Sequence, residues 1–175
     1  MDTTLTYFRK SAFSRDALVY SGDLDSQPAE GTLPFPIYYL DIGTRHINLC
    51  RNATQVTSPL LTGKQHGILG RTATIRGDII SSAHRNGVFS NAWTFVYMAE
   101  EFKWSISRWS TRWTLVDGRG NNVAVFERAS FRASKIGTLN ISAGLSEHLV
   151  WLVVLTCELV HRTVKASERA AAGGP

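Results

Sequence analysis

The stretch "HLVWLVVLTCELVH" (residues 148–161) is the most apolar run of the chain, and its interpretation decides the fold. Its uncharged centre, Leu149 to Cys157, would cover about 14 Å as an α-helix, less than half of a hydrocarbon core of about 30 Å. A longer segment would include Glu147, Glu158 and Arg162, and each charge near the bilayer centre costs about 2.5–3.5 kcal/mol. The run therefore predicts no transmembrane span.

The same run favours a helix over residues 146–165 that is enclosed by the rest of the protein. This segment lacks Gly and Pro, and Ser146 is a suitable N-cap. Its first half is apolar on every side, which is typical of a surrounded helix. Further on, Glu158, Arg162 and Lys165 fall near one another on the helical wheel. We expect the helix to enter a core and to emerge from it at its end.

The chain before this helix consists of short β-rich runs that are bounded by Gly, Asn, Asp or Ser. Runs at this spacing favour an all-β sandwich or barrel. A central helix needs a lumen, so the sequence predicts a mainly β fold with a closed antiparallel β-barrel around it. The runs cover residues 4–8, 37–42, 46–52, 71–77, 78–83, 88–98, 102–109, 112–118, 121–129 and 135–142.

The order and spacing of five motifs resemble the tubby-like superfamily, which includes tubby C-terminal domains, LURP-one-related proteins and phospholipid scramblases. The motifs are "RTATI", "WTFVYMAEEFKW", "NNVAVFER", "KIGTLNI" and "VVLTCELV". Together they cover roughly residues 35–164, and the chain is most similar to a fungal family of domains of unknown function. The resemblance implies about twelve strands wrapped around a hydrophobic C-terminal helix.

The sequence also indicates a domain organisation. A polar and partly ordered segment is expected at residues 1–34, the barrel with its helix at 35–165, and a frayed tail at 166–175. Features of the better-known relatives are missing: no phosphoinositide pocket can be placed residue by residue. The scramblase proline-rich segment, metal loop and membrane anchor also have no counterpart here.

The charge balance gives a mild preference for anionic partners. Nineteen Lys and Arg against fourteen Asp and Glu leave +5, with most of the excess after residue 100. Dedicated nucleic-acid binders usually carry a stronger excess, so no nucleic acid is expected as a partner. An anionic phospholipid or a protein remains as the expected partner, and a merely solvated basic surface is the simpler alternative.

One run, "FKWSISRWSTRW", places Lys103, Arg108 and Arg112 directly before tryptophans. Because neighbours in a strand point to opposite faces, we expect Trp104 and Trp113 inside and the three cations outside. These cations are candidates for binding an anion or a lipid headgroup, or are only solvated.

A second candidate is the glycine-rich run "GKQHGILGR" (residues 63–71), which matches no phosphate-binding motif and reads as a mobile loop. Lys64 and Arg71 are its candidate anion ligands.

Catalytic and metal-binding patterns are not found. Cys157 and His161 lie four apart on the predicted helix, but a buried cysteine has no access to a substrate. The five histidines show no zinc-ligand spacing. With two distant cysteines and no signal-peptide pattern, we expect an intracellular protein, cytoplasmic or peripheral at membranes.

The sequence thus favours a non-enzymatic binding or scaffold domain without metal or cofactor. Two alternatives remain open: a carrier of a small apolar ligand in the barrel lumen, and a protein–protein interaction module.

Overall fold

The computed structural model of the chain describes residues 2–11, 14–52, 57–66, 71–87, 90, 92–106, 110–129 and 134–173. They form twelve strands followed by one helix. The elements are β1 (Thr3–Arg9), β2 (Ala17–Ser21), β3 (Tyr38–Ile42), β4 (His46–Cys50), β5 (Leu61–His66), β6 (Thr72–Gly77), β7 (Ser81–Arg85), β8 (Trp93–Tyr97), β9 (Glu100–Ile106), β10 (Arg112–Val116), β11 (Asn122–Arg128), β12 (Lys135–Ile141) and α1 (Glu147–Ala171).

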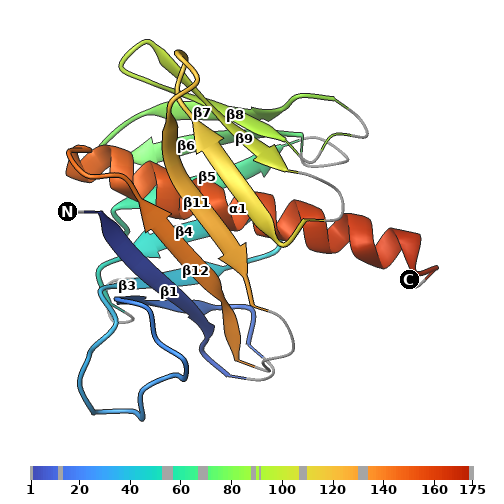
Figure 1. Cartoon of the computed structure of the whole chain (residues 1–175). Coiled ribbons are helices and arrows are strands. Elements are labelled where there is room, and N and C mark those ends of the chain that lie inside the picture. Colours follow the sequence, from blue (N-terminus) through green and yellow to red (C-terminus); the bar gives the residue numbers. More distant parts are fainter. Residues whose placement is uncertain are drawn as a thin grey trace.

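Each strand pairs antiparallel with its neighbours in the sequence, and β1 closes the sheet by pairing with both β2 and β12 (Figure 1). The result is a closed barrel without a free edge. The predicted mainly β fold, with about twelve antiparallel strands, is confirmed.

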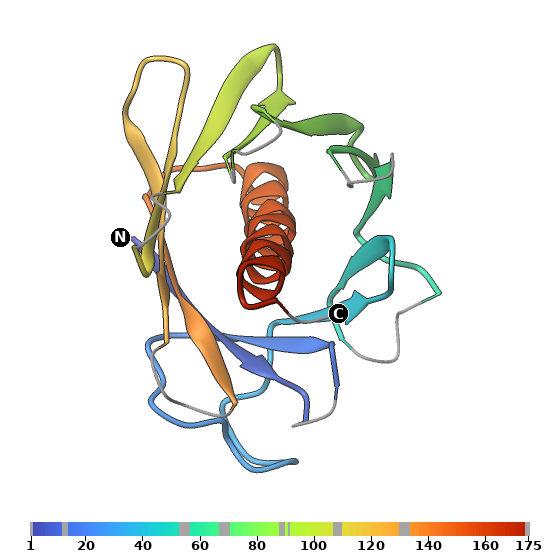
Figure 2. The same ribbon diagram turned by 90° about the vertical axis from the view of Figure 1, so that its right-hand side faces the viewer.

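The helix α1 runs through the middle of this barrel (Figure 2). Its N-cap is Ser146, whose hydroxyl accepts a hydrogen bond from the backbone N–H of Leu149 at 3.3 Å, as predicted. Every residue from Trp151 to His161 is buried. These eleven residues make three turns, so the helix is covered on all sides over this length. The opening apolar run is therefore a core helix inside the barrel, as predicted.

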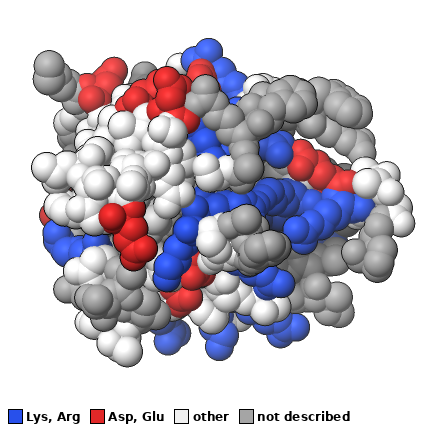
Figure 3. Space-filling view, turned by 90° about the horizontal axis from the view of Figure 1, so that it is seen from below, with Lys and Arg blue, Asp and Glu red and all other residues white. Residues whose placement is uncertain are grey.

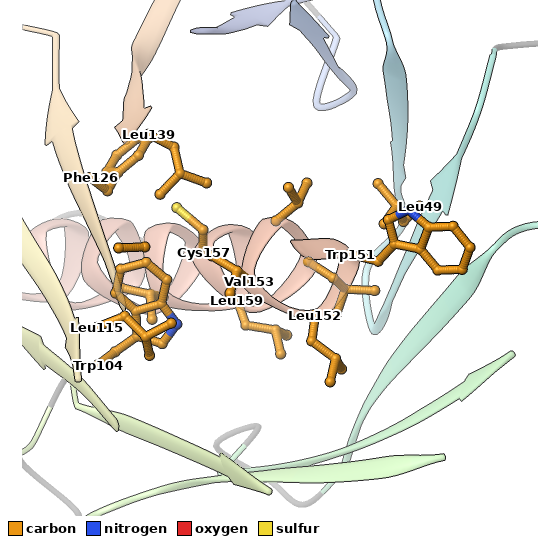
Figure 4. Packing of buried hydrophobic residues seen from close by; sticks show 14 of the residues in the cluster. Leu49, Trp104, Leu115, Phe126, Leu139, Trp151, Leu152, Val153, Cys157 and Leu159 are labelled. Atoms are coloured by element: carbon orange, nitrogen blue, oxygen red, sulfur yellow. The ribbon is translucent and has the colours of Figure 1, made fainter. Parts of the chain in front are cut away.

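The barrel core consists of inward side chains of the strands packed on α1 (Figure 4). Two buried hydrogen bonds join the two layers. The Trp104 indole donates to Thr156 Oγ1 at 3.0 Å, and the Trp93 indole donates to Thr163 Oγ1 at 3.0 Å. Because each bond joins a strand residue to a residue of the helix inside the core, the two bonds help to set the depth and rotation of the helix.

One glycine of the predicted mobile loop has a packing role instead. Gly63 lies in β5 and faces α1, where an added Cβ would meet Leu155 Cδ2 at 2.8 Å. The prediction of a loop was wrong for Gly63 to His66, because a glycine inside a strand can also mark the close approach of another element. Residues 67–70 of that run lie outside the described residues.

The barrel begins earlier than the predicted boundary at residue 35, because β1 and β2 are two of its strands. Leu5 and Tyr7 of β1 point into the core, while Thr4 and Thr6 alternate with them. The helix also extends to Ala171, beyond the predicted end at Lys165. The six added residues of the expected frayed tail, Ala166 to Ala171, include three alanines and no glycine or proline, which suits a helix.

Candidate anion-binding site

Because all strands are antiparallel, their connections fall alternately at the two ends of the barrel. At the end where the last turns of α1 emerge, strand ends and connections carry mainly Lys and Arg. We call it the basic end. Among the described residues, its cations include Arg9, Lys10, Arg15, Arg45, Arg71, Arg85, Arg112, Arg128, Lys135, Arg162, Lys165 and Arg169, and its acids include Asp16, Asp41, Glu127, Glu158 and Glu168.

The opposite end, where α1 begins, carries mainly carboxylates, and we call it the acidic end. Its acids include Asp2, Glu30, Asp78, Glu100, Glu101, Asp117 and Glu147, against Arg51, Arg76 and Arg119. The modest net charge of the chain therefore conceals a strong separation of charge along the barrel. Figure 3 shows one face of the molecule, on which Lys and Arg gather in a hollowed band toward the side where α1 emerges.

A pocket of about 280 Å³ lies at the basic end, between the last turns of α1 and the neighbouring strand ends. Its cationic lining comes from two separate parts of the chain: Arg9 at the end of β1 with Arg15 just before β2, and three residues of α1. Ile42 and Ile136 contribute apolar wall. The three helix cations are Arg162, Lys165 and Arg169.

The helix cations share one face because of their spacing. Glu158, Arg162, Lys165 and Arg169 follow one another at steps of four, three and four residues, which is the spacing of neighbours on one side of an α-helix. Positive charge is also favourable near the C-terminus of a helix dipole. That effect does not account for Arg9 and Arg15, which come from elsewhere in the chain.

Arg162 anchors the pocket wall. Its Nη2 donates to the carbonyl oxygen of Thr44 at 2.6 Å, and its Nη1 donates to that of His46 at 3.4 Å. Burial lowers the pKa of its guanidinium; the nearby Glu158 carboxylate opposes this effect, and the positive charge of Arg15 adds to it. Arg15 is thus close enough to Arg162 for repulsion, which an added anion would relieve.

The other four cations of the pocket have no ion-pair partner in the part of the chain that the structure describes. Arg9 is half-buried, Lys165 is half-buried, and Arg15 and Arg169 are exposed. Several unpaired cations around one hollow are the arrangement that binds phosphate or carboxylate groups.

Two buried polar side chains also line the pocket. The Glu158 carboxylate lies 3.2 Å from His161 Nδ1, and both side chains are almost fully buried. The adjacent thiol of Cys157 is buried too, and its pKa is raised well above the ordinary value by burial and then by Glu158. A catalytic thiol needs a lowered pKa and access to its substrate. Cys157 has a raised pKa and is buried, so it lacks both properties of a nucleophile.

A second pocket, of about 400 Å³, opens along the outer face of β1, β11 and β12. Its lining mixes acids and bases, and Lys135 Nζ lies 3.0 Å from Asp23 Oδ1. Because its charges of opposite sign compensate one another, this pocket is a weaker candidate for an anion.

The predicted anion-binding residues that the structure describes line neither of these two pockets. Lys103 lies on β9, exposed as predicted, opposite Val116. Arg112 begins β10 at the basic end and lies 3.8 Å from Glu127 Oε1. Lys64 and Arg71 are exposed on β5 and just before β6. Arg108 lies outside the described residues. The expected burial of Trp104 and Trp113 is confirmed.

Sequence reasoning missed the pocket because its cations are distant in the chain. Arg9 and Arg162 meet only because the barrel closes between β1 and β12 around the helix. One signal was present: the spacing of Arg162, Lys165 and Arg169 marks a basic stripe on the helix, beginning where its apolar run ends.

Comparison with protein-family models, with curated proteins and with solved structures finds no match to this chain. Within the described residues, the only helix has no apolar stretch long enough to cross a membrane. Over the same residues, no group of three or more His, Cys, Asp or Glu side chains is arranged to hold a metal ion.

Proposed function

We propose that this protein is a non-enzymatic, intracellular binding domain that docks peripherally on anionic phospholipid surfaces through its basic end. The observation that carries the proposal is the convergence of Arg9, Arg15, Arg162, Lys165 and Arg169 around one pocket. A lipid phosphate would sit in that pocket, and the surrounding cations would face the membrane plane. Each Lys or Arg near an anionic surface contributes about 1 kcal/mol.

The tubby-like resemblance belongs to the same proposal, including its fungal members. A twelve-stranded barrel around a C-terminal helix is the architecture which that resemblance implied, and the fold supports it. The pocket adds a location for anion binding that the sequence motifs did not provide.

The alternative of an apolar-ligand carrier required an empty lumen. In the structure α1 occupies the lumen, and side chains such as Leu152, Val154 and Leu155 have no exposed surface. The geometry therefore favours a surface function over transport inside the barrel.

Vesicle sedimentation tests the proposal. The wild-type protein should sediment with vesicles of phosphatidylcholine that contain about 30% phosphatidylserine, and not with phosphatidylcholine alone. The triple variant Arg15→Gln, Lys165→Gln, Arg169→Gln should bind about 100-fold more weakly, since it removes three contributions of about 1 kcal/mol each.

A matched control carries the same loss of charge away from the pocket. Arg76, Lys103 and Arg119 are exposed and lie away from the pocket lining, and their replacement by Gln should change binding by less than about threefold. Equal losses of vesicle affinity in both triple variants would show that binding depends on net charge and not on the pocket. Recovery of the wild type in the supernatant with both kinds of vesicle would refute membrane binding.

A further inference from the structure

The acidic end carries exposed apolar side chains that the membrane proposal does not use. Ile80 is 86% exposed and Met98 is 85% exposed, while Val96 is 40% exposed. They lie close together: Ser81 Oγ donates to the carbonyl oxygen of Val96 at 2.6 Å, Ile80 directly precedes Ser81 at the start of β7, and Met98 directly follows the end of β8, which pairs with β7. Ile80 and Met98 thus extend from neighbouring strand ends. Together these three residues form what we call the apolar tip.

Carboxylates border the apolar tip. Glu100 and Glu101 follow Met98 at the start of β9, and neither has an ion-pair partner within the described residues. The β10–β11 turn lies beside them, since a Cβ added to Gly118 would be 3.7 Å from the carbonyl oxygen of Glu101. This turn carries both Asp117 and Arg119, whose charges oppose each other, so Glu100 and Glu101 are the main acids of the border. An exposed apolar patch with a charged border is typical of a protein-binding surface.

The turn that carries Met98 has an unfavourable backbone conformation for its residues. Met98 and Ala99 have φ values of 50° and 64°, and they form the two-residue connection between the paired Tyr97 and Glu100. Such turns normally use Asn-Gly, because other residues are strained at positive φ. A methionine held there at the tip of a hairpin suggests that its side chain has a role at this position.

The complementary surface is present on the same chain. The pocket at the basic end joins the apolar walls of Ile42, Ile136 and Ala166 to a ring of cations. Its volume of about 280 Å³ is enough for one long apolar side chain such as methionine. An apolar tip bordered by carboxylates and an apolar hollow bordered by cations are complementary in polarity and in charge.

We propose that the chain associates head to tail with a second copy of itself, with the apolar tip of one copy in the basic pocket of the next. The Met98 side chain enters the pocket between Ile42 and Ile136. Glu100 and Glu101 face Arg15 and Arg169 of the neighbour. Because the two surfaces differ, the contact is heterologous: a pair of copies keeps one free pocket and one free tip, so further copies can add in a row.

This association stands apart from membrane binding, but it uses the same pocket. An anion in the pocket therefore competes with the apolar tip of the neighbouring copy. An anionic membrane surface should dissociate the head-to-tail assembly into monomers. The contact is small and largely electrostatic, so we expect it to be weak and to be diminished by salt.

Sedimentation velocity of the whole chain tests the association. At low salt the weight-average sedimentation coefficient should rise between about 10 and about 500 µM protein, the range of a weak contact. The double variants Glu100→Lys, Glu101→Lys and Arg15→Glu, Arg169→Glu should each remain monomeric, because each replaces attraction by repulsion.

Mixing these two double variants gives the sharper result. In a 1:1 mixture both kinds of contact are again between opposite charges, so association should return although neither variant associates alone. A mixture that remains monomeric overturns the proposal, and so does a wild-type protein that is monomeric throughout the range.

The apolar part of the proposed contact is tested by a matched pair of substitutions. Met98→Ser should weaken association about tenfold or more, while Leu33→Ser, at a 78% exposed side chain outside the apolar tip, should leave it unchanged. Equal effects of both substitutions contradict the geometry. If a peptide of alternating Lys and Leu binds the wild type, loses affinity with Met98→Ser, and no self-association is seen, the tip serves a foreign basic partner and the proposal is wrong.

Discussion

Cys50 shows how a single buried group links stability to pH. It lies in β4 with no exposed surface, and burial, followed by the charge of Asp41, raises the pKa of its thiol from 9.0 to about 11. A folded-state pKa above the unfolded value means that the neutral thiol favours the fold. This contribution is complete below pH 9 and is lost as the pH rises toward 11.

We therefore expect Cys50→Ala to flatten the alkaline fall in stability. The wild type should lose about 2 kcal/mol more than the variant between pH 9 and pH 11, which corresponds to the raised pKa. Urea unfolding at several pH values measures the difference. Parallel stability curves for the two proteins would contradict the assignment.

Residue patterns in the sequence predicted the environment of some residues correctly and of others wrongly. The alternation around Trp104 correctly placed it inside and Lys103 outside, because a half-buried strand must alternate. Gly63 was misread, since a glycine looks the same in a loop and under a neighbouring helix. Only the position of Leu155 distinguishes the two cases.

At the scale of the elements, α1 is both the simplest prediction and the main structural component. Its apolar first half had to be enclosed, and the described strands enclose it. β2 and β5 were not predicted, because "ALVYS" is only five residues long within a polar segment and "LTGKQH" is mostly polar. Their pairing with neighbouring strands, rather than their own propensity, makes them strands.

The burial of α1 predicts the effect of one charge at its centre. Val154 has no exposed surface, and an aspartate there would be an unpaired charge in an apolar core. We expect Val154→Asp to unfold the domain, with loss of the cooperative urea transition and of the near-ultraviolet circular dichroism. Ala170→Asp, on the exposed last turn of the same helix, should change stability by about 1 kcal/mol or less. A stable, folded Val154→Asp protein would be incompatible with a helix inside the barrel.

At the scale of the whole molecule, the closed barrel separates charge along its axis. Cations gather where α1 emerges, and carboxylates gather where it begins. The sequence predicted the barrel from its run lengths and its central helix. It did not predict the basic pocket, because Arg9 and Arg162 are brought together only by barrel closure. The two proposed contacts, with a membrane and with a second copy, both depend on this arrangement.

The position of α1 inside the barrel can be tested directly at two indole groups. Nuclear magnetic resonance should show the Hε1 protons of Trp93 and Trp104 close to the methyl groups of Thr163 and Thr156, since each indole donates to that threonine hydroxyl at 3.0 Å. Both indole protons should also exchange slowly with solvent, because the bonds are buried. Rapid exchange of both protons, without contacts to the two threonines, would contradict the central helix.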